Sequence, residues 1–137
     1  MDVKITVIGV QEVDGRTDTT EMTTIGKLHT DADGYVLQYA ESAATGLDNT
    51  VTNLRIQPQM VTMERTGAHA GLLVLECKKR HQCDYATPIG NVMLGVYTET
   101  VDMQMQDGIG TVKVAYTLDV GGNVMSRQKL TVRVDVV

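Results

Sequence analysis

Hydrophobic and polar residues alternate along most of the chain, and no segment carries a convincing apolar stripe of helical period. The first segment sets the pattern, because Val3, Ile5 and Val7 share one face while Lys4 and Thr6 share the other. Short runs rich in Gly, Asp and Asn separate the alternating segments and are typical of tight turns. The pattern predicts a first strand from the N-terminus to the turn at 14–15, followed by strands at about 17–30, 35–41, 52–57, 60–66, 70–77, 92–106, 112–120 and 124–136.

Three irregularities interrupt this regular pattern. The apolar residues change parity after Gly9, which predicts a β-bulge there. A second change of parity near Thr98 to Thr100 predicts a bulge or a sharp bend. The segment from Lys78 to Asn91 lacks a clear strand pattern, so we expect a long connection that acts as a lid or a structural cover.

About eight to ten strands joined mostly by short turns indicate an all-β, up-and-down antiparallel meander. Such a sheet would leave long exposed edges unless it closed on itself, so we predict a closed or nearly closed, lipocalin-like β-barrel. A two-sheet sandwich stays open as an alternative, although sandwiches of that kind need longer crossing connections. We see no internal repeat and no linker, so residues 1–137 are expected to form one domain.

Composition narrows the class of protein. The 137 residues are 42% hydrophobic and 21% charged, as in a globular domain with its own core. The net charge of −5 does not favour a binder of nucleic acid, and no run approaches the roughly 20 apolar residues of a membrane helix. No basic leader precedes an apolar run at the N-terminus, and the chain has two cysteines. We therefore expect a cytoplasmic protein with reduced thiols, and neither nucleic acid nor membrane as a partner.

Several short motifs, in order along the chain, resemble the YwiB-like family of calycin-type β-barrels, a small bacterial family of unknown function. The central motif is Tyr-Ala-Thr-Pro-Ile-Gly at 85–90, which precedes a strand through Tyr-Thr at 97–98. The others are Tyr-Ala-Glu-Ser at 39–42, Thr-Gly-Leu at 45–47 and Arg-Thr-Gly at 65–67. The resemblance spans nearly the whole chain. It implies a lipocalin-like barrel in a bacterial cytosolic protein and carries no established activity.

Polar side chains share the inward parity of three strands. Arg65 follows the parity of Val61 and Met63, and Glu41 follows that of Tyr39. Gln128 likewise shares the parity of its apolar neighbours. A buried guanidinium and carboxylate would have to be paired, since a lone charge in an apolar interior costs several kcal/mol. These groups could anchor a small ligand, or they could lie at strand ends and satisfy one another. The candidate binding residues are Glu41, Arg65, Tyr39, Tyr116, Gln128 and Tyr85.

Other chemistry has weaker support. Cys77, His81 and Cys83 could ligate zinc, but their spacing fits no familiar zinc pattern. A Cys83 nucleophile with His81 as its base is conceivable, and neither Ser42 nor Ser126 lies in a nucleophile-elbow motif. The basic run at 78–81 is more often a solvated loop than a phosphate site. We therefore predict no catalytic group, no metal and no cofactor.

Two functional hypotheses remain at the level of the sequence. In the first, the barrel binds a small, partly apolar ligand in its interior. In the second, the barrel is filled with side chains and acts as a structural or protein-interaction module. The volume of the interior distinguishes them, and the oligomeric state does not follow from the sequence.

Overall fold

The computed structural model describes residues 1–137 as a closed barrel of ten antiparallel strands. Each strand pairs with its neighbours in the chain, and β1 pairs with β10 to close the sheet, so the predicted up-and-down barrel is confirmed. None of the helical structure in the chain could span a membrane. The elements are β1 (Asp2–Val13), β2 (Arg16–Asp31), β3 (Gly34–Ala40), the 3₁₀ turn η1 (Ala43–Thr45), β4 (Thr50–Gln57), β5 (Met60–Gly67), β6 (Gly71–Glu76), β7 (Arg80–Thr87), β8 (Gly90–Gln106), β9 (Ile109–Val120) and β10 (Asn123–Val136).

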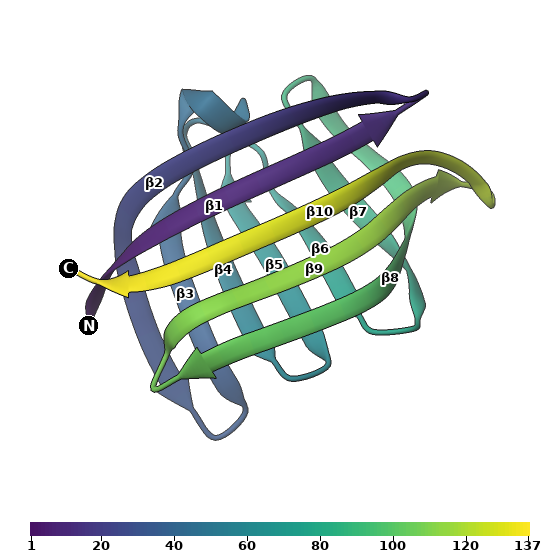
Figure 1. Ribbon diagram of the computed structural model, residues 1–137. Helices are drawn as coiled ribbons and strands as arrows, with labels where there is room; N and C mark the ends of the chain where they lie inside the picture. The colour runs from purple at the N-terminus through teal and green to yellow at the C-terminus, as the bar shows by residue number, and fades with distance from the viewer.

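The barrel is flattened into two layers of strands that cross each other (Figure 1). The long strands β1, β10 and β9 form the front layer in this view, and the shorter strands β3 to β7 cross behind them. The two longest strands, β2 with 16 residues and β8 with 17, curve from one layer to the other. Both chain termini lie at the same side of the molecule. Closure gives every strand a neighbour on both sides, although β6 and β7 pair at a single position.

Inward-facing residues of all ten strands form one hydrophobic core. Aliphatic residues and methionine dominate it, as expected for a chain without Phe or Trp. Burial is complete, or nearly so, for a set of β-branched and leucine side chains drawn from eight strands: Val3, Ile5, Leu37, Leu54, Ile56, Val61, Leu75, Val96, Val112, Val114, Val132 and Val134. This set fills the barrel by the close packing that stabilises protein interiors.

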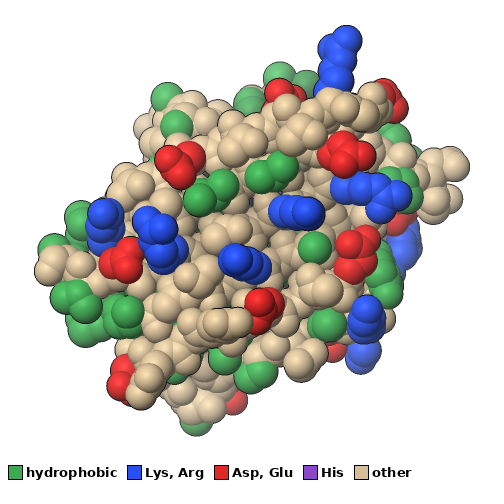
Figure 2. All heavy atoms as spheres, in the orientation of Figure 1, with side chains coloured by type: hydrophobic (Ala, Val, Ile, Leu, Met, Phe, Trp, Pro, Cys, Tyr) green, Lys and Arg blue, Asp and Glu red, His purple; other side chains and the backbone are tan.

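The outer surface carries charges of both signs. Figure 2 shows Lys, Arg, Asp and Glu interspersed across the face formed by β1, β10 and β9. Cross-strand neighbours account for part of this arrangement, because Lys4 lies opposite Asp135 and Lys113 lies opposite Asp102. Opposite charges facing each other across strands favour the observed register.

The bulge predicted at Gly9 is wrong. Strand β1 keeps one continuous register with both β10 and β2 through this position. The inward parity continues through Val7, Gly9 and Gln11, which all line a cavity, while Ile8 and Val10 occupy the outer parity and are half-buried. The apparent change of parity therefore reflects apolar residues on the outer face.

The irregularity predicted at Thr98 to Thr100 is confirmed, because the pairing of β8 with β9 shifts register between these residues. A second shift lies between Val124 and Ser126 in β10, which the sequence analysis did not predict. Both shifts occur in long, strongly curved strands, where an extra residue relieves the bend.

The long connection predicted from Lys78 to Asn91 is also wrong, since Arg80–Thr87 forms strand β7. This strand pairs along its whole length with β8 but meets β6 at a single pair, Leu72 and Asp84. Apolar and polar residues do alternate within β7, where Cys83 and Tyr85 share one face. The basic run Lys78 to Arg80 at its start obscured this pattern. The connection is consequently much shorter than predicted and consists of the turn between β7 and β8.

An ion pair on the outer face joins β7 to β9 across β8. Arg80 donates from Nε to Asp119 Oδ2 at 3.0 Å and from its terminal nitrogen to Oδ1 at 2.7 Å. The pair passes over Gly95 of β8, where an added Cβ would lie 2.5 Å from Asp119 Oδ1. Glycine at this position therefore provides the space for the ion pair.

This ion pair predicts an acid-sensitive contribution to stability. The hydrogen bonds from Arg80, and then the Gly122 N–H, lower the pKa of Asp119. A carboxylate with a lowered folded-state pKa stabilises the fold above its unfolded pKa, and this stabilisation is lost as the pH falls through the folded-state pKa. In denaturant unfolding, the difference between wild type and Asp119→Asn should be constant above about pH 5 and shrink below about pH 4. A difference that stays constant down to pH 2 would contradict the role given to the pair.

Candidate functional site

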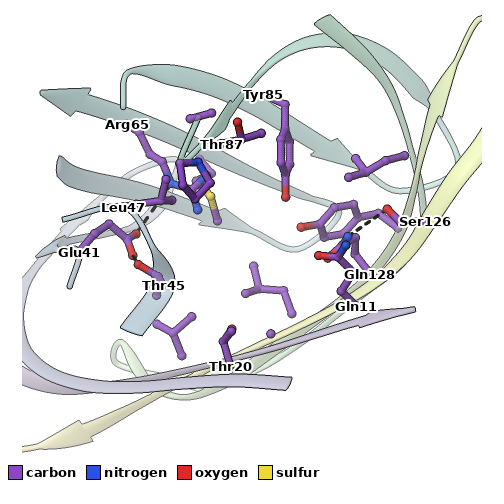
Figure 3. A pocket seen from close by; sticks show the side chains of 18 of the residues that line it. Gln11, Thr20, Glu41, Thr45, Leu47, Arg65, Tyr85, Thr87, Ser126 and Gln128 are labelled. Atoms are coloured by element: carbon purple, nitrogen blue, oxygen red, sulfur yellow. Dashed lines mark hydrogen bonds and ion pairs between the residues drawn. The ribbon is translucent and has the colours of Figure 1, made fainter. Parts of the chain in front are cut away.

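One end of the barrel encloses a cavity of about 470 Å³. Seven of the ten strands contribute to its wall, together with η1, the residues that follow it and the turn between β7 and β8. Its apolar residues include Val7, Leu47, Met63, Leu118 and Leu130. Its polar residues include Gln11, Thr20, Glu41, Thr45, Arg65, Ser126 and Gln128 (Figure 3). Apolar and polar residues therefore share the wall, and small-molecule sites combine both kinds of group.

Two short segments meet at the mouth of this cavity. Ser42 caps η1 by accepting a hydrogen bond from the Ala44 N–H, and Gly46 ends it in the left-handed conformation at φ 77°. This turn directs Leu47 into the cavity wall, where it is buried. A Cβ on Gly46 would lie 2.8 Å from Cγ of Pro88, so η1 and the β7–β8 turn are in contact. Glycine is required here both by the backbone and by the close approach.

The carboxylate of Glu41 lies at the base of this segment and is almost fully enclosed, with 2% of its side chain exposed. Its Oε1 accepts a hydrogen bond from Thr45 at 3.0 Å, and its Oε2 accepts one from Thr52 at 2.5 Å. Both oxygens are therefore satisfied by hydroxyl groups of the protein. Burial of the charge is tolerated because of these bonds and the nearby cation.

That cation is Arg65, which reaches the cavity from β5. Strand register explains the meeting, since Tyr39, Thr52 and Arg65 lie opposite one another on β3, β4 and β5. Arg65 Nε lies 3.8 Å from Glu41 Oε2, which is an ion pair but too long for a hydrogen bond. The Nε atom is buried without any hydrogen-bond partner. The guanidinium is thus held near the carboxylate with its donors unused.

Three tyrosines line the same cavity. Tyr39 and Tyr116 are buried, and Tyr85 projects into the cavity from β7 (Figure 3). Burial raises the pKa of all three phenols. The hydroxyl groups therefore stay neutral at physiological pH and can donate hydrogen bonds.

Gln128 lies on β10 opposite Tyr116 of β9. Its Nε2 donates a hydrogen bond to Ser126 Oγ at 3.0 Å, two residues earlier in the same strand. The amide is thus positioned by its own strand at the wall of the cavity, across from η1 (Figure 3). Its Oε1 remains available as an acceptor.

All six residues selected from the sequence, namely Glu41, Arg65, Tyr39, Tyr116, Gln128 and Tyr85, lie on the wall of this one cavity. That they bind a ligand stays a prediction. Sequence reasoning missed Gln11, Thr45 and Leu47. Continuing the parity of β1 through Gly9 would have found Gln11. No periodic signal exists for Thr45 and Leu47, because they lie in a turn.

Cys77, His81 and Cys83 do not converge on a common point. Cys83 is buried in the core, where its sulfur accepts the Val74 N–H, and burial raises its pKa. His81 pairs with Glu76 at 2.8 Å. No group of three or more His, Cys, Asp or Glu side chains is arranged to hold a metal ion. A raised thiol pKa also disfavours the nucleophilic thiolate.

The fold and the cavity define a ten-stranded up-and-down β-barrel with a partly polar chamber at one end. The family model described as Domain of unknown function (DUF1934) matches residues 5–132, so the chain belongs to this family. The crystal structure of ywiB protein from Bacillus subtilis is similar, with a TM-score of 0.78 and 20% sequence identity over 96% of this chain and 90% of that one. The resemblance to the YwiB-like family is thereby confirmed. No curated protein matches the chain.

Proposed function

We propose that this chain is a cytosolic, lipocalin-like protein that binds a small, partly apolar molecule in the barrel cavity. The observation that carries the proposal is the cavity of about 470 Å³, whose wall combines apolar residues with a cluster of oriented polar groups. This volume falls within the roughly 300–1,000 Å³ of small-molecule sites. A ten-stranded barrel is wider than the eight-stranded barrels whose interior just holds side chains or one small ligand.

The division of the interior into two parts supports binding over a purely structural role. At one end, side chains such as Leu54, Ile56 and Val61 fill the barrel and stabilise it. At the other end, the wall includes Gly9, whose missing side chain leaves space in the chamber. A barrel built only for stability would gain from filling this space, because cavities cost stability. The ligand would recover that cost by contact with Val7, Leu118 and their apolar neighbours.

The cytosolic assignment is supported by the cysteines. Cys77 and Cys83 are both free, and Cys83 is buried as a core residue. Unpaired thiols are common in a reducing compartment.

Native mass spectrometry of the protein, isolated gently from its own host, tests the proposal. We expect one small molecule bound per chain. Val7→Phe is the matched variant, because its larger ring would occupy the chamber without adding charge. The same preparation of Val7→Phe should have the mass of the bare chain. An identical adduct on both proteins, at full occupancy, would place the molecule outside the cavity and contradict the proposal.

A further inference from the structure

We propose that the ligand is an organic anion, with one oxyanion group such as a carboxylate that Arg65 binds and an apolar body that fills the rest of the chamber. This inference rests on the proposed function and specifies the chemistry of the same site. It follows from the unused hydrogen-bond donors of Arg65 in the wall of the cavity.

Arg65 provides the unused donors. Its side chain is only 15% exposed and lines the cavity, yet it donates no hydrogen bond within the protein. A guanidinium has five N–H donors in a fixed fork that matches a carboxylate or another oxyanion. Leaving such a group largely buried without hydrogen-bond partners is costly, and an anionic acceptor would reduce that cost.

Glu41 does not fill this role. Its two oxygens already accept hydrogen bonds from Thr45 and Thr52, and the closest approach of Arg65 Nε is 3.8 Å. Only 2% of the Glu41 side chain is exposed, so this wall residue presents little surface to the contents of the chamber. Its negative charge therefore supports the buried guanidinium from one side without occupying its donors.

The other groups around the chamber fit the same ligand. Tyr85 and Tyr116 have neutral hydroxyl groups near the cavity, and neither makes a hydrogen bond within the protein. They can donate to an oxygen of the ligand. The remaining wall is mixed. Leu47, Leu118 and Leu130 suit a hydrocarbon or aromatic body, whereas the carboxylate of Asp18 lies on the exposed part of the wall contributed by β2.

Two dyes that differ by one charged group test the inference. The probes are 1-anilinonaphthalene-8-sulfonate, which carries an oxyanion, and N-phenyl-1-naphthylamine, which has the same ring system and no charge. Fluorescence titration should give one site per chain for each dye, with the sulfonate bound about tenfold tighter or more. Arg65→Met should lower the affinity for the sulfonate dye by about tenfold to a hundredfold, the range of a charge-assisted contact. Its affinity for the neutral dye should stay within about twofold of wild type.

Control variants separate this effect from general changes in charge or folding. Arg133→Met removes the same charge from an exposed outer position, where Arg133 contacts Asp135, and should leave both affinities unchanged. If Arg65→Met unfolds because Glu41 loses its partner, the double variant Glu41→Gln with Arg65→Met keeps the site neutral. The double variant is expected to show the same selective loss of sulfonate binding.

Each outcome has one meaning. Selective loss of the sulfonate on removal of Arg65 supports the inference. Equal affinities of wild type for the two dyes, unchanged by Arg65→Met, would overturn the anion preference while the chamber remains a binding site. Failure of both dyes to bind wild type would overturn the proposed function and the inference with it.

Discussion

Gly26→Ala is expected to destabilise the barrel by about 3 kcal/mol, and to lower its melting temperature by on the order of 10 °C. Gly26 is buried in β2 and lies opposite Val3 of β1. At the next residue, Lys27, the other edge of β2 begins to pair with β3. A Cβ here would lie 2.5 Å from the carbonyl oxygen of Gln38 and 2.5 Å from Cδ1 of Ile5. A backbone oxygen cannot move aside cheaply, so the strong curvature of β2 depends on this glycine.

Gly9→Ala is the matched control for this substitution. Gly9 also lies within a strand, but an added Cβ would meet only the Thr20 hydroxyl, at 3.1 Å. A side-chain tip can shift, so we expect the free energy of unfolding to change by less than about 1 kcal/mol. Chemical denaturation of the two variants beside wild type gives the comparison. Equal losses at the two positions would show that strand propensity, rather than close approach, sets the cost.

Leu54→Ala should lower the free energy of unfolding by about 2–5 kcal/mol. Leu54 is fully buried and lies between Leu37 of β3 and Met63 of β5, in the filled part of the barrel. Removing its side chain loses the free energy of burying apolar atoms. It also leaves a cavity, because the paired strands around it cannot move far enough to fill the void. Urea unfolding measures the change.

Leu72→Ala is the corresponding control on the outer face. Leu72 is 44% exposed on β6, so its truncation should cost no more than about 1 kcal/mol. The slope of the unfolding curve should match wild type in both variants, because neither change alters the extent of the buried surface. A small loss at Leu54 would mean that the interior is loosely packed even at the filled end.

Much of the fold followed from parity alone. Alternation in β3, β5 and β9 assigned the inward faces correctly, since one side of each strand is buried and the side-chain period is two. The short turns favoured closure over a sandwich, because closure pairs the exposed edges without long crossing connections. Parity failed where apolar residues occupy the outer face, as at Ile8 and Val10, because burial there depends on neighbours that a single sequence does not reveal.

Only part of the cavity could be predicted from the sequence. Parity placed Arg65 and Glu41 on inward faces, but their separation depends on the register of β3 with β4 and of β4 with β5. Strand β7 was hidden because the basic residues Lys78 and Lys79 precede it and Arg80 begins it. The partner of Arg80, Asp119 of β9, comes near only when the sheet is assembled. The volume of the chamber depends on how every side chain packs, so no local pattern could predict it.

The central claim is that the chamber takes up a small apolar molecule. Its most direct test is a titration of wild type and Val7→Phe with the neutral dye N-phenyl-1-naphthylamine. The dye carries no charge, so its binding does not depend on Arg65. We predict saturable binding of one dye per chain to wild type, and a loss of at least about tenfold in affinity for a folded Val7→Phe, whose ring occupies the chamber. Equal binding to both proteins, or no binding to wild type, would contradict it.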